Sequence, residues 1–210
     1  MATQSKGADL ERAHWIVARM KELPKYCMFL YNVLLDTRLS WDMKEHAFGT
    51  LHYVFEESDI IADDDPLLGR LDDLTMVFRC FTELIARLPA GTLAIYEEVL
   101  ARDRIPIRAY IIEAPLWLDK FYQAIAGLYR TKIDQHKQFL GNAIKTGALV
   151  RGMQAFLAHE QQHPQTFSPD RLAAIEAFIS SFATPVAGTG GGSAPAGVQP
   201  AAGGMPAKHA

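Results

Sequence analysis

Residues 56–73 read EESDIIADDDPLLGRLDD, and they lie between two segments with a strongly helical pattern. Eight carboxylates accompany a single arginine in this stretch, so their mutual repulsion must be compensated. Helix caps and ion pairs are favoured, because Asp65 directly precedes Pro66 and because Asp72 and Asp73 fall early in the next helix. A divalent cation is the less favoured alternative, since the spacing is not that of a calcium-binding loop. Its oxygen ligands would be Asp59, Asp63, Asp72 and Asp73.

Apolar residues recur at steps of three and four on both sides of this stretch, which predicts helices. Upstream, the pattern predicts one helix that ends at Pro24, a second over about 25–36 and a third that is capped by Ser40. Downstream, the most regular seam predicts a helix at the centre of the core. This seam consists of Leu71, Leu74, Phe78, Phe81, Ile85 and Leu88.

The second half of the chain is also helical in pattern. Thr92 is the predicted cap of a helix that runs to about Arg102. Pro115 and several glycines interrupt the segment 106–163, which predicts two or three helices or one kinked helix. Ser168 before Pro169 predicts the start of a final helix. No segment alternates with a period of two, so the predicted fold is an all-α, irregular bundle of six to eight helices.

Composition divides the chain into three parts. A helical domain is predicted over residues 9–183, after a disordered N-terminus at residues 1–8. Residues 184–210 are rich in Ala, Gly and Pro, which predicts a disordered tail because such a segment buries too little apolar surface to offset its ordering entropy.

Charge and cysteine content favour a cytoplasmic protein without a nucleic-acid partner. The net charge of −3 and the pI near 6.2 give no basic footprint for nucleic acid. Cys27 and Cys80 lie in apolar helical patterns without a metal-binding or redox spacing, so reduced core thiols are expected. The N-terminus lacks the apolar region of a signal peptide, and no segment reaches the roughly 20 apolar residues of a membrane span.

The acidic stretch also carries a recognisable signature, which follows a helix that contains Tyr53. Its residues are Asp59, Ile61, Asp63, Pro66, Gly69, Asp72 and Asp73. With the apolar seam that follows, this pattern resembles the YkvA-like family, a bacterial helical domain of unknown function, over about residues 28–88. The resemblance implies a small helical domain without established catalysis, often in proteins near or in membranes. The chain departs from the family at Glu57 and Ala62, where prolines are usual.

A second motif, His159-Glu160-Gln161-Gln162-His163, matches the H-E-x-x-H pattern of zinc hydrolases. In that chemistry the two imidazoles hold zinc and Glu160 is the general base. Pro164 places the motif at a helix end, and no third ligand or strand-lined cleft is evident. The pattern therefore favours a polar C-terminal helical turn, with zinc-dependent hydrolysis as a low-ranked alternative.

Basic residues are interspersed with apolar ones over residues 130–151, which is typical of a solvated helix face and also of a peripheral contact with anionic lipid. The sequence contains no phosphate-binding loop, no nucleophile elbow and no requirement for a cofactor. The favoured function is a non-enzymatic protein-interaction or scaffold module that binds a protein partner or itself. A membrane-peripheral protein is the second hypothesis.

Overall fold

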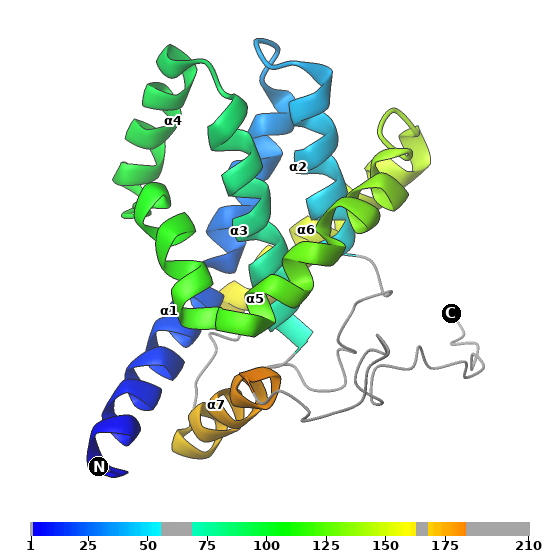
Figure 1. Cartoon of the computed structure of the whole chain (residues 1–210). Coiled ribbons are helices and arrows are strands. Elements are labelled where there is room, and N and C mark those ends of the chain that lie inside the picture. The colour runs from blue at the N-terminus through cyan, green and yellow to red at the C-terminus, as the bar shows by residue number, and fades with distance from the viewer. Residues whose placement is uncertain (1, 56–68, 163–167, 184–210) are drawn as a thin grey trace, which may run out of the picture.

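The computed structural model describes residues 2–55, 69–162 and 168–183, and these residues form helices and no strands. The prediction of an all-α bundle of six to eight helices is confirmed for this part of the chain. The predicted tail at 184–210 lies outside the described residues. The helices are α1 (Ala2–Leu35), α2 (Trp41–Val54), α3 (Gly69–Arg87), α4 (Ala90–Arg102), α5 (Ile107–Lys137), α6 (Ala143–Gln162) and α7 (Pro169–Ala183) (Figure 1).

Helix α3 contributes much of the core, as its apolar seam predicts. Leu71, Leu74, Phe78 and Phe81 are fully buried between α1, α2 and α5. Burial of each such side chain stabilises the fold by about 1.5–3 kcal/mol relative to an exposed position. An aromatic cluster surrounds this helix, with ring centroids 5.6–6.4 Å apart. Its members are Trp15, Tyr26, Phe78 and Tyr110.

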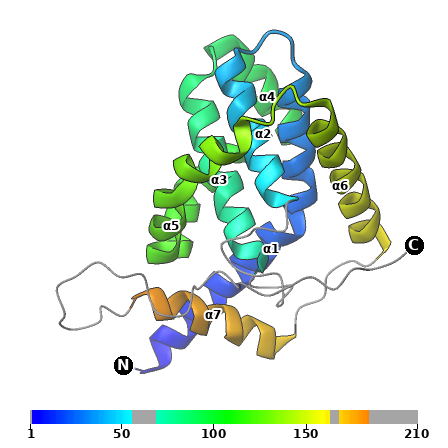
Figure 2. The ribbon, with the colours of Figure 1, turned by 90° about the vertical axis from the view of Figure 1, so that its right-hand side faces the viewer.

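Helix α7 crosses the base of the bundle, where it packs against α1 and α5 (Figures 1 and 2). Ile175 and Ile179 are buried there, and Phe178 contacts Phe121 edge to face at 5.7 Å. The predicted start of this helix is confirmed, because the Ser168 hydroxyl accepts a hydrogen bond from the Arg171 backbone N–H at 3.4 Å. The helix therefore closes the end of the core that α2 does not reach.

The prediction that Pro24 ends the first helix is wrong. Helix α1 continues through Pro24 to Leu35, and it begins at Ala2, inside the segment 1–8 that composition places outside the folded domain. An interior proline costs a helix about 3 kcal/mol. Leu23 and Tyr26 are fully buried beside it, and their packing offsets that cost.

One other predicted helix boundary needs correction. Helix α4 begins at Ala90, and its N-cap position is Pro89, three residues before the predicted cap Thr92. The prediction of two or three helices, or one kinked helix, over 106–163 is confirmed for the described residues, because α5 and α6 occupy this segment. Pro115 lies inside α5, and the kink of α5 falls at Asp119, whose φ of 46° and ψ of −125° are not helical. The predicted cap at Ser40 is confirmed by its bond from the Met43 backbone N–H at 3.5 Å.

Candidate functional site

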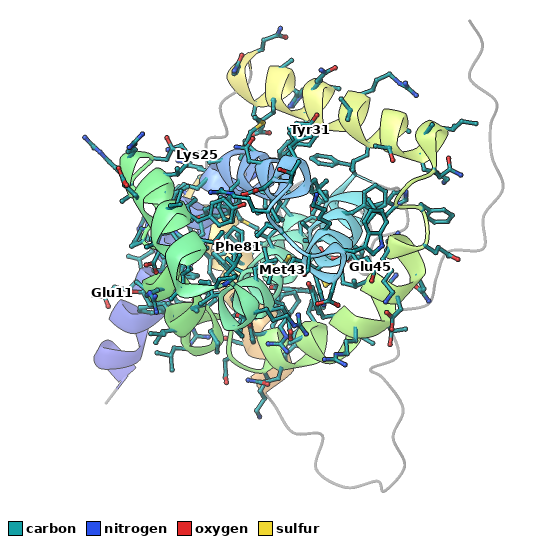
Figure 3. All side chains as sticks on the ribbon, turned by 90° about the horizontal axis from the view of Figure 1, so that it is seen from above. Glu11, Lys25, Tyr31, Met43, Glu45 and Phe81 are labelled. Atoms are coloured by element: carbon teal, nitrogen blue, oxygen red, sulfur yellow. The ribbon has the colours of Figure 1, made fainter. Side chains whose placement is uncertain are left out.

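A groove of about 620 Å³ lies between α1, α4 and α6. Helix α1 forms its floor, and Figure 3 shows Lys25 and Tyr31 on α1 in the region between the other two helices. The apolar residues that line it are Met28, Phe29, Val99, Leu100 and Leu157. Three helices that are distant in sequence thus build one concave apolar surface.

The rim of this groove carries a positive charge on the α1 side. Lys21 and Lys25 are exposed there, and the Lys25 ammonium donates to the Asp103 backbone carbonyl at 3.4 Å. Two carboxylates also line the groove, on Asp103 and Glu160. Glu160 is paired with Arg70, so its charge is compensated within the protein.

The ion pair between Arg70 and Glu160 joins the two motifs of the sequence. The Arg70 guanidinium lies 2.8 Å from the Glu160 carboxylate, and both side chains are largely buried. Arg70 also lies over the Phe156 ring at 5.2 Å, and Phe156 packs against Phe55. Helix α6 is therefore held to the start of α3 and the end of α2 by one charged and one aromatic contact.

This contact bears on the hypothesis of a zinc hydrolase. Glu160 Oε1, which would have to face a zinc-bound water, lies against Arg70 and 3.7 Å from His159 Nδ1. His163 lies outside the described residues. Within the described ranges, no group of three or more His, Cys, Asp or Glu side chains could hold a metal ion. The geometry gives Glu160 a structural role in fastening α6.

The signature of the acidic stretch is only partly described. Gly69 begins α3, and Asp72 and Asp73 follow within the first turns as predicted, both buried. The Tyr53 hydroxyl donates a hydrogen bond of 2.5 Å to the Asp72 carboxylate, which joins the end of α2 to the start of α3. Asp59, Ile61, Asp63 and Pro66 lie outside the described residues.

Two buried histidines form a pair that no sequence pattern predicts. His52 on α2 and His136 on α5 place their Nδ1 atoms 3.0 Å apart, with 6% and 4% of their surfaces exposed. Phe139 stacks on the His52 ring at 5.3 Å, and the Tyr53 ring meets His136 edge-on at 5.9 Å. The two residues are separated by 84 positions and belong to no motif, so only the packing of α2 against α5 brings them together.

A further buried chain of hydrogen bonds begins at His46 on α2. Arg87 donates to His46 Nε2 at 3.0 Å, so Nδ1 carries the proton and faces the Tyr129 hydroxyl at 3.2 Å. Tyr129 also lies 3.5 Å from the Thr50 hydroxyl. Burial lowers the pKa of His46, and the charge of Arg87 lowers it further. His46 is thus held neutral as a structural link between α2, α3 and α5.

The basic segment 130–151 spans the end of α5 and the start of α6. Ile133 and Leu149 are buried in the core, whereas Ile144 is 81% exposed. Lys137 pairs with Glu45 at 3.4 Å and with Asp134 at 3.0 Å. Two apolar side chains of the basic segment therefore pack inside the protein. No helix in the described ranges has the length and apolar character needed to cross a bilayer.

The two cysteines are buried free thiols, as predicted. Burial raises the pKa of the Cys80 thiol to about 11, and it also raises the pKa of Cys27.

Comparison of the chain with protein-family models, with curated proteins and with solved structures gives no match. Function is therefore inferred from the geometry of the chain itself.

Proposed function

We propose that this protein is a non-enzymatic helical module that binds an apolar, acidic segment of a partner protein in the groove between α1, α4 and α6. The observation that carries the proposal is the groove itself, whose floor and walls are apolar and whose α1 rim bears Lys21 and Lys25. A concave apolar surface with a few charged groups at its edge is the usual form of a binding site.

Exposed apolar side chains in the groove supply the driving force. Met28 is 36% exposed and Val99 is 39% exposed, although both line a concave surface. Covering such surface yields about 25 cal/mol per Å² of apolar area. A partner side chain that enters the groove would gain this energy at both residues.

Charge favours an acidic partner. Lys21 and Lys25 lie exposed at the α1 rim, and the Glu160 carboxylate that also lines the groove is already paired with Arg70. Complementary charge at a rim speeds encounter and fixes orientation more than it raises affinity. The partner segment therefore combines apolar anchors with Asp or Glu residues.

The test uses a random peptide library selected against the purified chain. Enriched peptides are expected to combine apolar and acidic residues, and Val99→Asp is expected to abolish their binding. Ile144→Asp is the matched control, because Ile144 is exposed on α6 and does not line the groove. Equal binding by the wild type and Val99→Asp would refute the proposal, as would a selection without enriched peptides.

We also propose that residues 28–88 are a divergent YkvA-like domain and that the protein is cytoplasmic. The hydrogen bond between Tyr53 and Asp72 supports the first point, because it ties a signature residue to the helix that precedes the signature. A solved YkvA-like domain that lacks the corresponding Tyr–Asp contact would count against the family assignment.

Two buried free thiols support the proposed cytoplasmic location. Recovery of the protein outside the cytoplasmic fraction would contradict this location.

A further inference from the structure

We propose that His52 and His136 form a binding site for a divalent transition-metal ion of the kind that imidazole favours, such as Zn²⁺. The proposal goes beyond the groove, from which it is independent. The two Nδ1 atoms face each other at 3.0 Å from different helices. Two nitrogens on one tetrahedral zinc ion, each about 2.0–2.1 Å from the metal, lie about 3.3 Å apart. The pair therefore needs to open by only about 0.3 Å to admit the ion.

The surroundings of the pair hold both rings in place. Phe48 and Phe139 contact the His52 ring at 5.6 and 5.3 Å, and Tyr53 contacts the His136 ring. The Tyr53 hydroxyl in turn donates to the buried Asp72 carboxylate. Side chains that are already fixed lose little conformational entropy when they bind a ligand, and the carboxylate adds negative charge in the next layer.

Proton balance is simple at this site. In the metal-free pair, one ring donates from Nδ1 and the other accepts at Nδ1. A metal ion needs the lone pair of both Nδ1 atoms, so the donor ring must move its proton to Nε2. Binding thus replaces one N–H···N hydrogen bond with two metal–nitrogen bonds.

A cavity of about 130 Å³ lies beside His52 and gives solvent access to that side of the pair. His52 lines it together with Phe55, Lys145 and Leu149. Its volume exceeds the roughly 30 Å³ that one water occupies in the liquid. Within the described residues the two imidazoles are the protein ligands of the proposed site, and water from this cavity fills further coordination positions.

The experiment measures metal binding by the full chain after treatment with a chelator. Zn²⁺ is titrated by equilibrium dialysis, and Co²⁺ is used as a spectroscopic probe of nitrogen coordination. Three forms are compared, namely the wild type, His136→Gln and the control His159→Ala. The control removes the exposed imidazole of His159 in the H-E-x-x-H motif, which could bind metal at the surface. We expect the wild type and His159→Ala to bind one ion per chain and His136→Gln to lose it.

The proposal is overturned if the wild type binds no metal, or if His159→Ala loses binding while His136→Gln keeps it. Circular dichroism checks that His136→Gln is folded. Should this variant not fold, imidazole NMR of the wild type decides the question. Zn²⁺ must then shift the resonances of both His52 and His136, and unchanged resonances would refute the site.

Discussion

Helices α2 and α6 both carry histidines and aromatic residues near their C-terminal ends, but they relate to the core in different ways. The end of α2 is buried between α3 and α5, where His52 and Tyr53 are almost fully covered. Helix α6 buries only Leu149 and Met153, and its His159 is exposed. Polar groups in α2 are therefore fixed by packing, whereas only a few contacts hold α6 against the rest of the bundle.

Loss of core packing should produce the largest difference in stability between the two regions. Phe78→Ala removes a fully buried ring of α3 that packs against Tyr26 and Tyr110, and it should cost about 3–5 kcal/mol of stability. Phe156→Ala on α6 should cost clearly less, because Phe156 is only half-buried. Urea-unfolding midpoints of both variants measure the difference. Equal losses would show that α6 belongs to the same cooperative core.

Close approach of α2 to α5 should make one glycine indispensable. A Cβ at Gly49 would lie 3.1 Å from Ile133 Cγ2 and 3.3 Å from its carbonyl oxygen. Gly49→Ala should therefore destabilise the protein by about 1–3 kcal/mol. Gly127→Ala is the control in α5, since nothing lies within 4 Å of the added Cβ, and it should stabilise by about 0.5–1 kcal/mol. Thermal unfolding that moves both variants in the same direction would contradict the packing of α2 on α5.

Removal of a single hydroxyl tests the buried hydrogen bond at the end of α2. Tyr53→Phe removes the donor to Asp72 and should cost about 1–3 kcal/mol, because the carboxylate loses this bond inside the protein. Tyr31→Phe is the control, since Tyr31 is only half-buried. Chemical denaturation of the two variants provides the measurement, and an unchanged Tyr53→Phe midpoint would argue against the contact.

Helix α6 should respond to the loss of its ion pair. Glu160→Gln should cost about 1 kcal/mol, the upper end for such pairs, because Arg70 and Glu160 are largely buried. Glu98→Gln breaks an exposed pair with Arg102 and should cost less than about 0.5 kcal/mol. Hydrogen exchange of α6 amides is the sensitive readout. Exchange that is no faster in Glu160→Gln than in Glu98→Gln would mean that other contacts fasten α6.

The smallest expected effect concerns pH. The pKa of His46 is lowered in the folded protein, so between its folded and unfolded pKa values the unfolded chain binds more protons. The stability from neutral His46 is thus fully present above the ordinary histidine pKa of about 6.5 and is lost as pH falls below it. His46→Gln should flatten the fall in melting temperature between about pH 7 and 5.5. An unchanged slope would exclude His46 as a source of this dependence.

Local patterns were sufficient for much of this fold. The step of three and four from Leu71 to Leu88 predicts the buried seam of α3, and Ser40 and Ser168 predict two helix starts. Pro24 shows the limit of such rules, because burial of its neighbours outweighs its local penalty. The contact between Arg70 and Glu160 joins residues ninety positions apart, and no spacing rule relates them.

The sequence by itself determined that the described chain is helical, since periodicity and capping are properties of neighbouring residues. Tertiary structure alone decided which polar groups meet. The pair of His52 and His136, and the groove walled by α4 and α6, depend on how helices that are distant in sequence pack. The physical reason is that burial drives packing without specifying partners, so the shapes of whole helices select which side chains face each other.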